Sequence, residues 1–337
     1  MAELNASDQD NNDPYRKYRF NPDFGEGLTG KCNPAIFLLR WSPSTQPNLF
    51  RLNIAGLKHV RFGQPIFDPR NSNVLYATGF ELTKDGRSLG IKHCLNRPFG
   101  IWRLTMPLPS MAEGERKKPN RATIDVEAVQ KLTSSHQSCR SPRILDTGEH
   151  STLVWLACAC GGAHASTTTL HTLNIKATAS KLDIEALVTA ETPLVDIVKE
   201  PLSDTRTFPG LYPSYNLVSS PFISHGDDCD RQHEVLLSSQ WGSRNTILRL
   251  SLKDRNVQEI TPVTDGKLYS WSLLATDGGQ NFVCSRSAPD VPYELLLGRF
   301  QKNGEVDWLL LDKPVLHRNG ESHVQFQMHT PIEDTFY

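Results

Sequence analysis

The sequence predicts an all-β protein built as an array of similar strand units. Three observations support this prediction: short apolar runs with strand-like alternation recur along the chain, turn-forming residues separate them, and the runs fall into groups of three. Internal units of this size are typical of a β-propeller. Because the units differ in length and no Trp-Asp pair recurs, periodicity alone leaves a sandwich or a barrel open.

We expect about four antiparallel units of three or four strands each between Pro34 and Asp312. Two strands at residues 34–40 and 49–54, joined by a Ser-Pro-Ser-Thr-Gln-Pro turn, look like the end of one unit. The next unit is a meander with strands at residues 63–69, 74–78 and 101–104. Its first strand ends at an Asp-Pro pair, since Pro fixes its own φ and restricts the residue before it.

Three later units repeat this plan, and the first strand of two of them contains Pro next to apolar residues. Between the second and third units, the pattern around residues 126–132 also allows a short helix. The predicted strands of the later units lie at residues 141–145, 151–157, 169–175, 220–223, 234–239, 246–252, 268–274, 281–284 and 293–300.

The chain divides into three parts. Residues 1–17 are polar, rich in Asn and Asp and without periodicity, so we expect a disordered tail. Residues 18–315 form the strand array, which we interpret as a partial β-propeller. Residues 316–337 form a connection that leads away from it.

Composition excludes several function classes. The net charge is −1, with 36 basic and 37 acidic residues well mixed along the sequence. We therefore expect no broad region of positive electrostatic potential that would attract nucleic acid or acidic lipid. We interpret the short basic cluster Arg116-Lys-Lys118 as a solvated loop. No apolar run approaches the roughly 20 residues that span a bilayer. We therefore expect neither nucleic acid nor membrane as a partner.

Cysteine usage points to the cytoplasm. Seven cysteines at irregular spacing follow an N-terminus without the apolar core of a signal peptide. The match Asn5-Ala-Ser7 to a glycosylation site would then go unused, because the acceptor has to enter the secretory route.

One long motif resembles a known family. Leu89-Gly-Ile-Lys-His-Cys-Leu-Asn-Arg97 is similar to a segment in the propeller of acylaminoacyl-peptidases (acylamino-acid-releasing enzymes), serine peptidases related to prolyl oligopeptidase. The resemblance covers residues 18–337, at low identity but in preserved order, and it starts about midway through the family's propeller. Four further segments carry it: Phe24-Gly-Glu-Gly-Leu28, Ser141-Pro-Arg-Ile-Leu145, Phe208-Pro-Gly-Leu-Tyr212 and Lys267-Leu-Tyr-Ser-Trp-Ser-Leu-Leu274.

The resemblance implies a non-catalytic portion of a peptidase that releases N-acylated amino acids from peptides. The propeller would restrict entry to short N-acylated peptides, while an α/β-hydrolase domain absent from these residues would supply the serine, the histidine base and the oxyanion hole. The implied partners are that hydrolase domain, the peptides and possibly further copies of the chain. The alternative is a free-standing propeller-like interaction module.

Gly86-Arg-Ser-Leu-Gly90 matches the nucleophile-elbow pattern, which would make Ser88 catalytic. That chemistry needs a buried strand before the serine and a helix after it, so that the side chain stands on a strained turn. Polar residues 81–85 come before the motif and Pro98 follows, which disfavours an elbow helix. We therefore interpret the motif as a loop and predict that this chain does not hydrolyse acyl-amino-acid substrates.

No residue is predicted to bind a metal or a cofactor. Cys158 and Cys160, with His164 and His171, fit none of the usual zinc spacings. Gly25-Glu-Gly27 and Gly161-Gly162 lack the lysine and the strand-to-helix context of phosphate-binding loops, so both are interpreted as turns. We interpret three C-terminal histidines as loop residues without a catalytic role: His317, His323 and His329.

Overall fold

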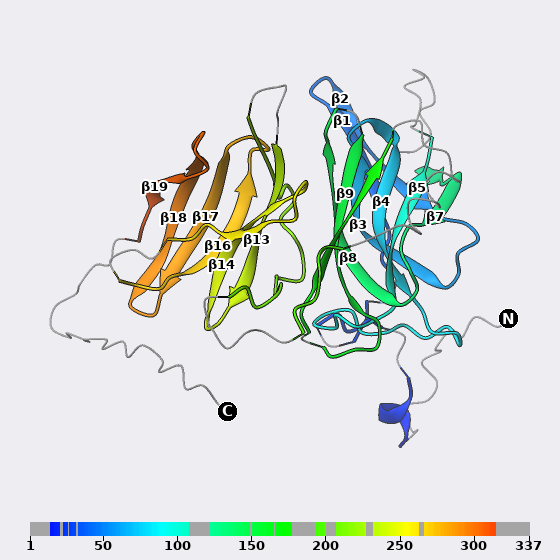
Figure 1. Cartoon of the computed structure of the whole chain (residues 1–337). Coiled ribbons are helices and arrows are strands. Elements are labelled where there is room, and N and C mark those ends of the chain that lie inside the picture. The colour runs from blue at the N-terminus through cyan, green and yellow to red at the C-terminus, as the bar shows by residue number, and fades with distance from the viewer. Residues whose placement is uncertain are drawn as a thin grey trace.

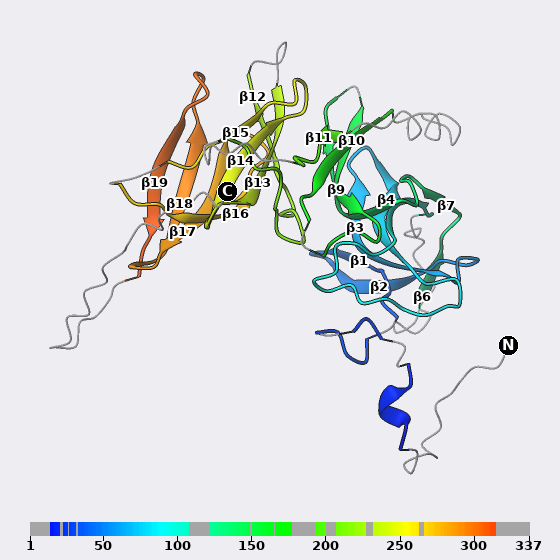
Figure 2. The same cartoon turned by 60° about the horizontal axis from the view of Figure 1, so that its bottom comes forward.

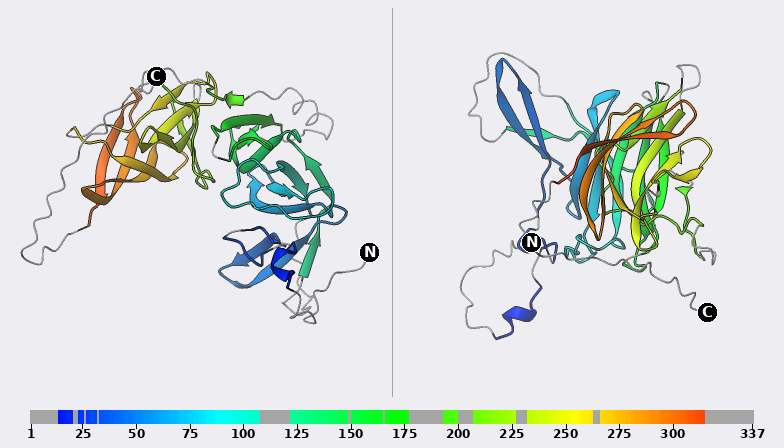
Figure 3. Two further views of the ribbon diagram at one scale, coloured as in Figure 1. Left: turned by 90° about the horizontal axis from the view of Figure 1, so that it is seen from below. Right: turned by 90° about the vertical axis from the view of Figure 1, so that its left-hand side faces the viewer.

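Five β-sheets stand side by side in an arc in the computed structural model of the chain (Figures 1 and 3). Within the described residues the helical content is one short 3-10 turn, η1 (Arg16–Tyr18), so the all-β prediction is confirmed. The structure describes residues 14–20, 23–25, 27–31, 33–107, 122–148, 150–164, 166–176, 193–199, 207–226, 232–262 and 266–314.

The strands fill the sheets in chain order, except that one strand returns to the first sheet. The first sheet contains β1 (Phe37–Ser42), β2 (Thr45–Asn53) and β6 (Ala122–Asp125), and the second contains β3 (Val60–Asp68), β4 (Asn71–Glu81), β5 (Phe99–Thr105) and β7 (Ala128–Lys131). The third contains β8 (Gln137–Asp146), β9 (Ser151–Ala159), β10 (Thr169–Ile175) and β11 (Pro193–Val195). The fourth contains β12 (Phe222–His225), β13 (Gln232–Trp241), β14 (Arg244–Ser251) and β15 (Val257–Glu259), and the fifth contains β16 (Ser270–Thr276), β17 (Asn281–Ala288), β18 (Val291–Phe300) and β19 (Val306–Asp312).

The predicted unit count is confirmed, with one error inside the second unit. The second to fifth sheets are antiparallel and four-stranded, whereas β6 joins β2 in parallel. The short helix that the pattern around residues 126–132 allowed is not formed, because β7 lies there. Its residues pair with Trp102 to Thr105 of β5, and this pairing supplies the backbone hydrogen bonds that a helix would otherwise have made.

The core lies between the sheets. The second strand of an inner sheet is buried on both faces: along β9, Leu153 and Trp155 pack toward the second sheet, while Val154 and Leu156 pack toward the fourth. Such a strand is apolar without interruption because both of its faces meet another sheet. Four apolar clusters separate the five sheets in this way, one at each boundary. Face-to-face packing in sequence is the arrangement of propeller blades.

The arc leaves two outer sheet faces (Figure 2). One belongs to the first sheet and the other to the fifth, since each has a neighbouring sheet on one side. Among the described helices, none is long and apolar enough to cross a membrane.

Candidate functional site

The long connection between β4 and β5, residues 82–98, lies at one end of the sheets, which we call the connection end (Figure 1). On one side the Ile91 amide donates to the Phe24 carbonyl oxygen at 3.4 Å, and the Phe24 ring packs edge-on against Phe80. On the other side the Asn96 carbonyl oxygen accepts from the Gly161 amide at 2.7 Å. The connection thus joins the N-terminal loop to the third sheet.

The connection end continues across the fourth sheet. The Thr168 amide donates to the Leu211 carbonyl oxygen at 2.8 Å, and the Gln240 amide donates to the Tyr212 carbonyl oxygen at 3.0 Å. Backbone contacts therefore run from residue 24 to residue 240 along this end. Three of the segments that resemble the acylaminoacyl-peptidase family contribute to this path, although they are far apart in the sequence: Phe24, residues 89–97 and residues 208–212.

Gln64 joins the second sheet to the third sheet and to the segment that leads into the fourth. Its side-chain oxygen accepts from the Thr78 hydroxyl at 2.6 Å and from the Ser141 amide at 2.9 Å, and its amide nitrogen donates to Asn216 at 2.5 Å. Gln64 interrupts the β3–β4 register and has a positive φ of 52°. A bulge with this conformation turns the side chain away from its own ladder.

One buried guanidinium group and one partly buried group hold the segment that leads into β12. Arg140 is fully buried, and its Nε donates to the Tyr215 carbonyl oxygen at 3.0 Å. Arg143 donates to the carbonyl oxygens of Leu217 and Val218. Burial raises the pKa of Tyr215 to about 12, so the phenol stays protonated at neutral pH. The arrangement orders the backbone of this segment.

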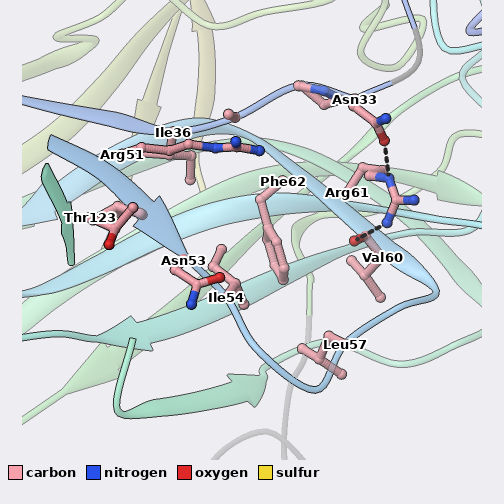
Figure 4. Close-up of a pocket in the computed structure, with 13 residues that line it drawn as sticks. Asn33, Ile36, Arg51, Asn53, Ile54, Leu57, Val60, Arg61, Phe62 and Thr123 are labelled. Atoms are coloured by element: carbon pink, nitrogen blue, oxygen red, sulfur yellow. Dashed lines mark hydrogen bonds between the residues drawn. The ribbon is translucent and has the colours of Figure 1, made fainter. Parts of the chain in front are cut away.

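A pocket of about 340 Å³ opens between the first and second sheets (Figure 4). Leu57, Val60 and Phe62 form its apolar part, and Arg51 and Arg61 contribute cations. The described lining residues include no carboxylate, histidine or thiol. Arg61 is held in place, because its Nε donates to the Asn33 side chain at 3.0 Å. This pocket could bind a small group but has no acid or base with which to catalyse a reaction.

A charged cluster lies between the fourth and fifth sheets. The Arg249 Nε donates to Glu234 at 2.5 Å, its Nη2 lies 2.9 Å from the His225 Nε2, and its Nη1 donates to the Gly304 carbonyl oxygen at 3.3 Å. All three guanidinium nitrogens have partners, and the Arg249 guanidinium also stacks over the Phe300 ring. The cluster therefore joins two sheets.

Ser88 lies in the connection, in irregular backbone. A turn precedes it, in which the Thr83 amide donates to the Arg87 carbonyl oxygen and the Gly86 amide donates to the Thr83 carbonyl oxygen. Residues 89–107, all of them described, contain no helix. The strand–serine–helix order that an elbow requires is therefore not formed here. That no residue of this chain is catalytic stays a prediction.

The cysteine and histidine residues have other contacts. The Cys158 sulfur lies 3.5 Å from the Arg140 Nη1, and the His171 ring stacks on Trp155 at 5.5 Å while its Nε2 lies 2.8 Å from the Thr169 hydroxyl. No group of three or more potential metal ligands occurs among the described residues. The glycine pairs predicted as turns have positive φ at Gly25, Gly27 and Gly161. His317, His323, His329 and the Arg116 cluster lie outside the described residues.

Sequence reasoning missed Gln64, Arg140 and the cluster around Glu234. Gln64 and Arg140 are single polar residues within strands whose partners are distant in sequence. Glu234 has its partners on the two neighbouring strands, 9 and 15 residues away. The Gln64 contacts reach 77 and 152 residues along the chain. One signal was available: a charged residue directly before the predicted strand at residues 141–145 indicates either a surface or a paired buried group.

Comparison with known proteins places the sequence within one family of domains. The family model described as "Acylamino-acid-releasing enzyme, N-terminal domain" matches residues 2–323. The acylamino-acid-releasing enzyme of Arabidopsis thaliana is 27% identical over 326 residues, and acylamino-acid-releasing enzyme 1 of Oryza sativa subsp. japonica is 28% identical over 278 residues. These matches cover 93% and 80% of this chain but 39% and 32% of the relatives, so the chain spans well under half of their length.

Solved structures give distant matches. A puromycin-hydrolyzing peptidase of Mycobacterium tuberculosis is 12% identical with a TM-score of 0.38, and the match covers 82% of this chain and 45% of that protein. Prolyl oligopeptidase B from Galerina marginata is 10% identical with a TM-score of 0.41, over 76% of this chain and 31% of that protein.

Proposed function

This chain belongs to the family of the acylamino-acid-releasing enzyme N-terminal domain, and from that premise we propose that it is the non-catalytic propeller portion of such a peptidase. It limits which substrates reach a hydrolase domain that lies outside these residues. The substrates are short peptides with an N-acylated first residue. The protein acts in the cytosol, in keeping with the free state of all five described cysteines.

The connection end is the observation that carries this proposal. Residues 24–25, 27–31, 82–98 and 160–162 meet there, and β19 runs toward the same end. Its last residue, Asp312, lies opposite Leu295, near the start of β18. A domain that followed the array would therefore begin beside the connection end. The hydrogen bonds of this end favour a surface of fixed shape, which is what exclusion by size requires.

The proposed exclusion is steric. Adjacent sheets share apolar clusters with many fully buried side chains, so little space for a folded protein exists between them. If the active site lies at the connection end, a substrate reaches it around the edges of that end and not between the sheets. Short unfolded peptides pass, and folded proteins do not.

A free-standing interaction module is the second candidate. The observation that favours it is the pair of outer sheet faces, since an exposed sheet face can receive a partner.

The transcript separates the two functions. Sequencing the messenger RNA beyond the codon for Tyr337 should reveal a reading frame for a hydrolase domain. The full product should then cleave acetylated di- and tripeptides much faster than long acetylated polypeptides, measured as kcat/KM. A stop codon directly after Tyr337 in the expressed transcript would contradict the peptidase role and support the interaction module.

A further inference from the structure

The pocket between the first and second sheets combines two arginines with a short apolar surface (Figure 4). Arg51 of β2 and Arg61 of β3 line it, and the described lining residues include no Asp or Glu. Its volume of about 340 Å³ is near the lower limit of small-molecule sites, which have about 300–1,000 Å³. A ligand of this pocket is therefore small, and it meets cations without a carboxylate in the described lining.

Arg61 is ordered before any ligand binds. Its Nε donates to the Asn33 side-chain oxygen at 3.0 Å, and its Nη1 donates to the Lys58 carbonyl oxygen at 3.1 Å. Among the described residues, no hydrogen bond or ion pair engages its Nη2. A guanidinium that is already held in place loses little further conformational entropy when it binds an anion, and its Nη2 can donate to one.

Arg51 supplies the second cation. Its side chain extends from β2 toward the side of the pocket that carries Asn33 and Arg61 (Figure 4). The residue is exposed, and within the described part of the chain no ion pair or hydrogen bond holds its side chain. It can therefore turn toward an anion that Arg61 has bound. A carboxylate that contacts both guanidinium groups accepts charge-assisted hydrogen bonds, which are stronger than those between neutral groups.

A carboxylate beside the pocket limits the charge of the ligand. Asp125 of β6 accepts a hydrogen bond from the Asn53 side chain at 2.6 Å. Asn53 lines the pocket, whereas Asp125 does not. The positive charge of the two arginines is thus partly balanced from outside the lining. A monoanion suits the remaining charge better than a phosphate dianion.

The apolar part of the pocket selects the group that the carboxylate is attached to. Leu57, in the loop between β2 and β3, is half-buried and packs against the cluster that contains Val60 and Phe62. Val60 and Phe62 are only 9% and 5% exposed, so the apolar surface that a ligand can cover is small. It accommodates a short hydrocarbon chain, and each methylene group buried there adds affinity.

We propose that this pocket binds a small monocarboxylic acid with a short branched apolar group. The carboxylate lies between Arg51 and Arg61, and the hydrocarbon part lies on Leu57. The inference is independent of the proposed function, because it uses the residues of this pocket alone.

Titration of the full chain with 4-methylpentanoate tests the site. The NMR signals of the backbone amides of Leu57 and Arg61 should shift and saturate with a Kd of about 1 mM or below, an affinity suited to so small a ligand. Acetate lacks the branched chain and 4-methylpentanamide lacks the charge, so each should bind about tenfold more weakly or worse. Inorganic phosphate should also bind more weakly than 4-methylpentanoate.

Two variants separate the site from a general effect of charge. Arg51→Gln should weaken the binding of 4-methylpentanoate by about fivefold or more. Its thermal unfolding should match that of the wild type, because the replaced side chain is exposed. Lys58→Gln is the matched control, since it removes an exposed positive charge from the same loop but outside the lining, and it should change the affinity by less than about twofold.

Four results would overturn the proposal. The first is no binding of 4-methylpentanoate at about ten times the expected Kd, and the second is binding that leaves the amides of Leu57 and Arg61 unshifted. The third is equal affinity for the acid and its amide, or for 4-methylpentanoate and acetate or phosphate. The fourth is equal affinity of Arg51→Gln and Lys58→Gln for 4-methylpentanoate.

Discussion

The side-chain oxygen of Gln64 accepts a hydrogen bond from the backbone amide of Ser141, 77 residues later, at 2.9 Å. The same oxygen also accepts from Thr78, and the Ser141 hydroxyl accepts from the Leu217 amide at 2.9 Å. One bulge in the second sheet is thereby tied to the third sheet and to the approach to the fourth. The arc is held together by apolar clusters and by a small number of polar ties of this kind.

Gln64→Ala should lower the free energy of unfolding by about 1–3 kcal/mol, because it removes the partners of Thr78, Ser141 and Asn216 together. Alanine has the same difficulty as glutamine with the positive φ, so the loss reports the hydrogen bonds. Urea unfolding measures it. Gln240→Ala is the matched control, since its side chain donates locally to the Gly242 carbonyl oxygen, and it should change stability by less than about 0.5 kcal/mol. Equal effects of the two variants would contradict the role of Gln64.

Glu234→Gln should destabilise the protein by about 2–5 kcal/mol. The side chain of Glu234 is 6% exposed and neutralises Arg249, whose own side chain is 12% exposed. The neutral amide would leave a guanidinium uncompensated between two sheets, and an unpaired buried charge is costly. Thermal and urea unfolding measure the loss. Glu305→Gln, at an exposed turn, serves as the control and should be close to neutral.

The double variant Glu234→Gln, Arg249→Gln tests the reason for that loss. Removing both charges should recover part of the stability, because no buried charge then lacks a partner. A double variant that is less stable than the sum of the two single changes would contradict this explanation.

Tyr215→Phe should leave stability at pH 7 nearly unchanged, because the buried hydroxyl has no hydrogen-bond partner among the described residues. At high pH the variant should gain on the wild type. Burial raises the pKa of Tyr215 from 10.0 to about 12, so its contribution is complete below pH 10 and is lost as the pH rises toward 12. Over that window the wild-type free energy of unfolding should fall more steeply, by up to about 1.4 kcal/mol per pH unit.

Urea unfolding at pH 7, 10 and 11 checks this sign. Tyr212→Phe, at an exposed ring, is the control. If the wild type and Tyr215→Phe lose stability in parallel above pH 10, the phenol is not responsible.

The strands with strong apolar patterns could be predicted from the sequence. β4 and β9 are buried on both faces, and their continuous apolar runs between turn residues indicate buried strands. The fourth strands could not. β11 and β15 have three residues each, too few to show a period of two. They form because the edges of β10 and β14 have backbone groups with which they pair. The residues of β7 allowed a short helix for the same reason: a strand of four residues is too short to distinguish the period of a strand from that of a helix.

The polar ties were beyond sequence reasoning because their meaning depends on position. The role of Gln64 depends on a bulge and on a positive φ, and neither can be recognised from the fact that the residue is a glutamine. Which residues of the first sheet face outward also depends on register: a shift by one residue would have turned Trp41 inward.

The last prediction is that the chain, purified alone, does not hydrolyse acetyl-amino-acid anilides. Acyl transfer needs a nucleophile, a base and oxyanion donors within hydrogen-bond reach of one another. Ser88, the one serine in an elbow-like motif, lies in the connection with no helix after it through residue 107. At high concentration, the chain and its Ser88→Ala variant should show the same background release of anilide. The Arabidopsis thaliana relative, assayed in parallel, serves as the positive control. Turnover by the wild type that Ser88→Ala abolishes would contradict the prediction, and it would mean that the connection rearranges into a catalytic turn when substrate binds.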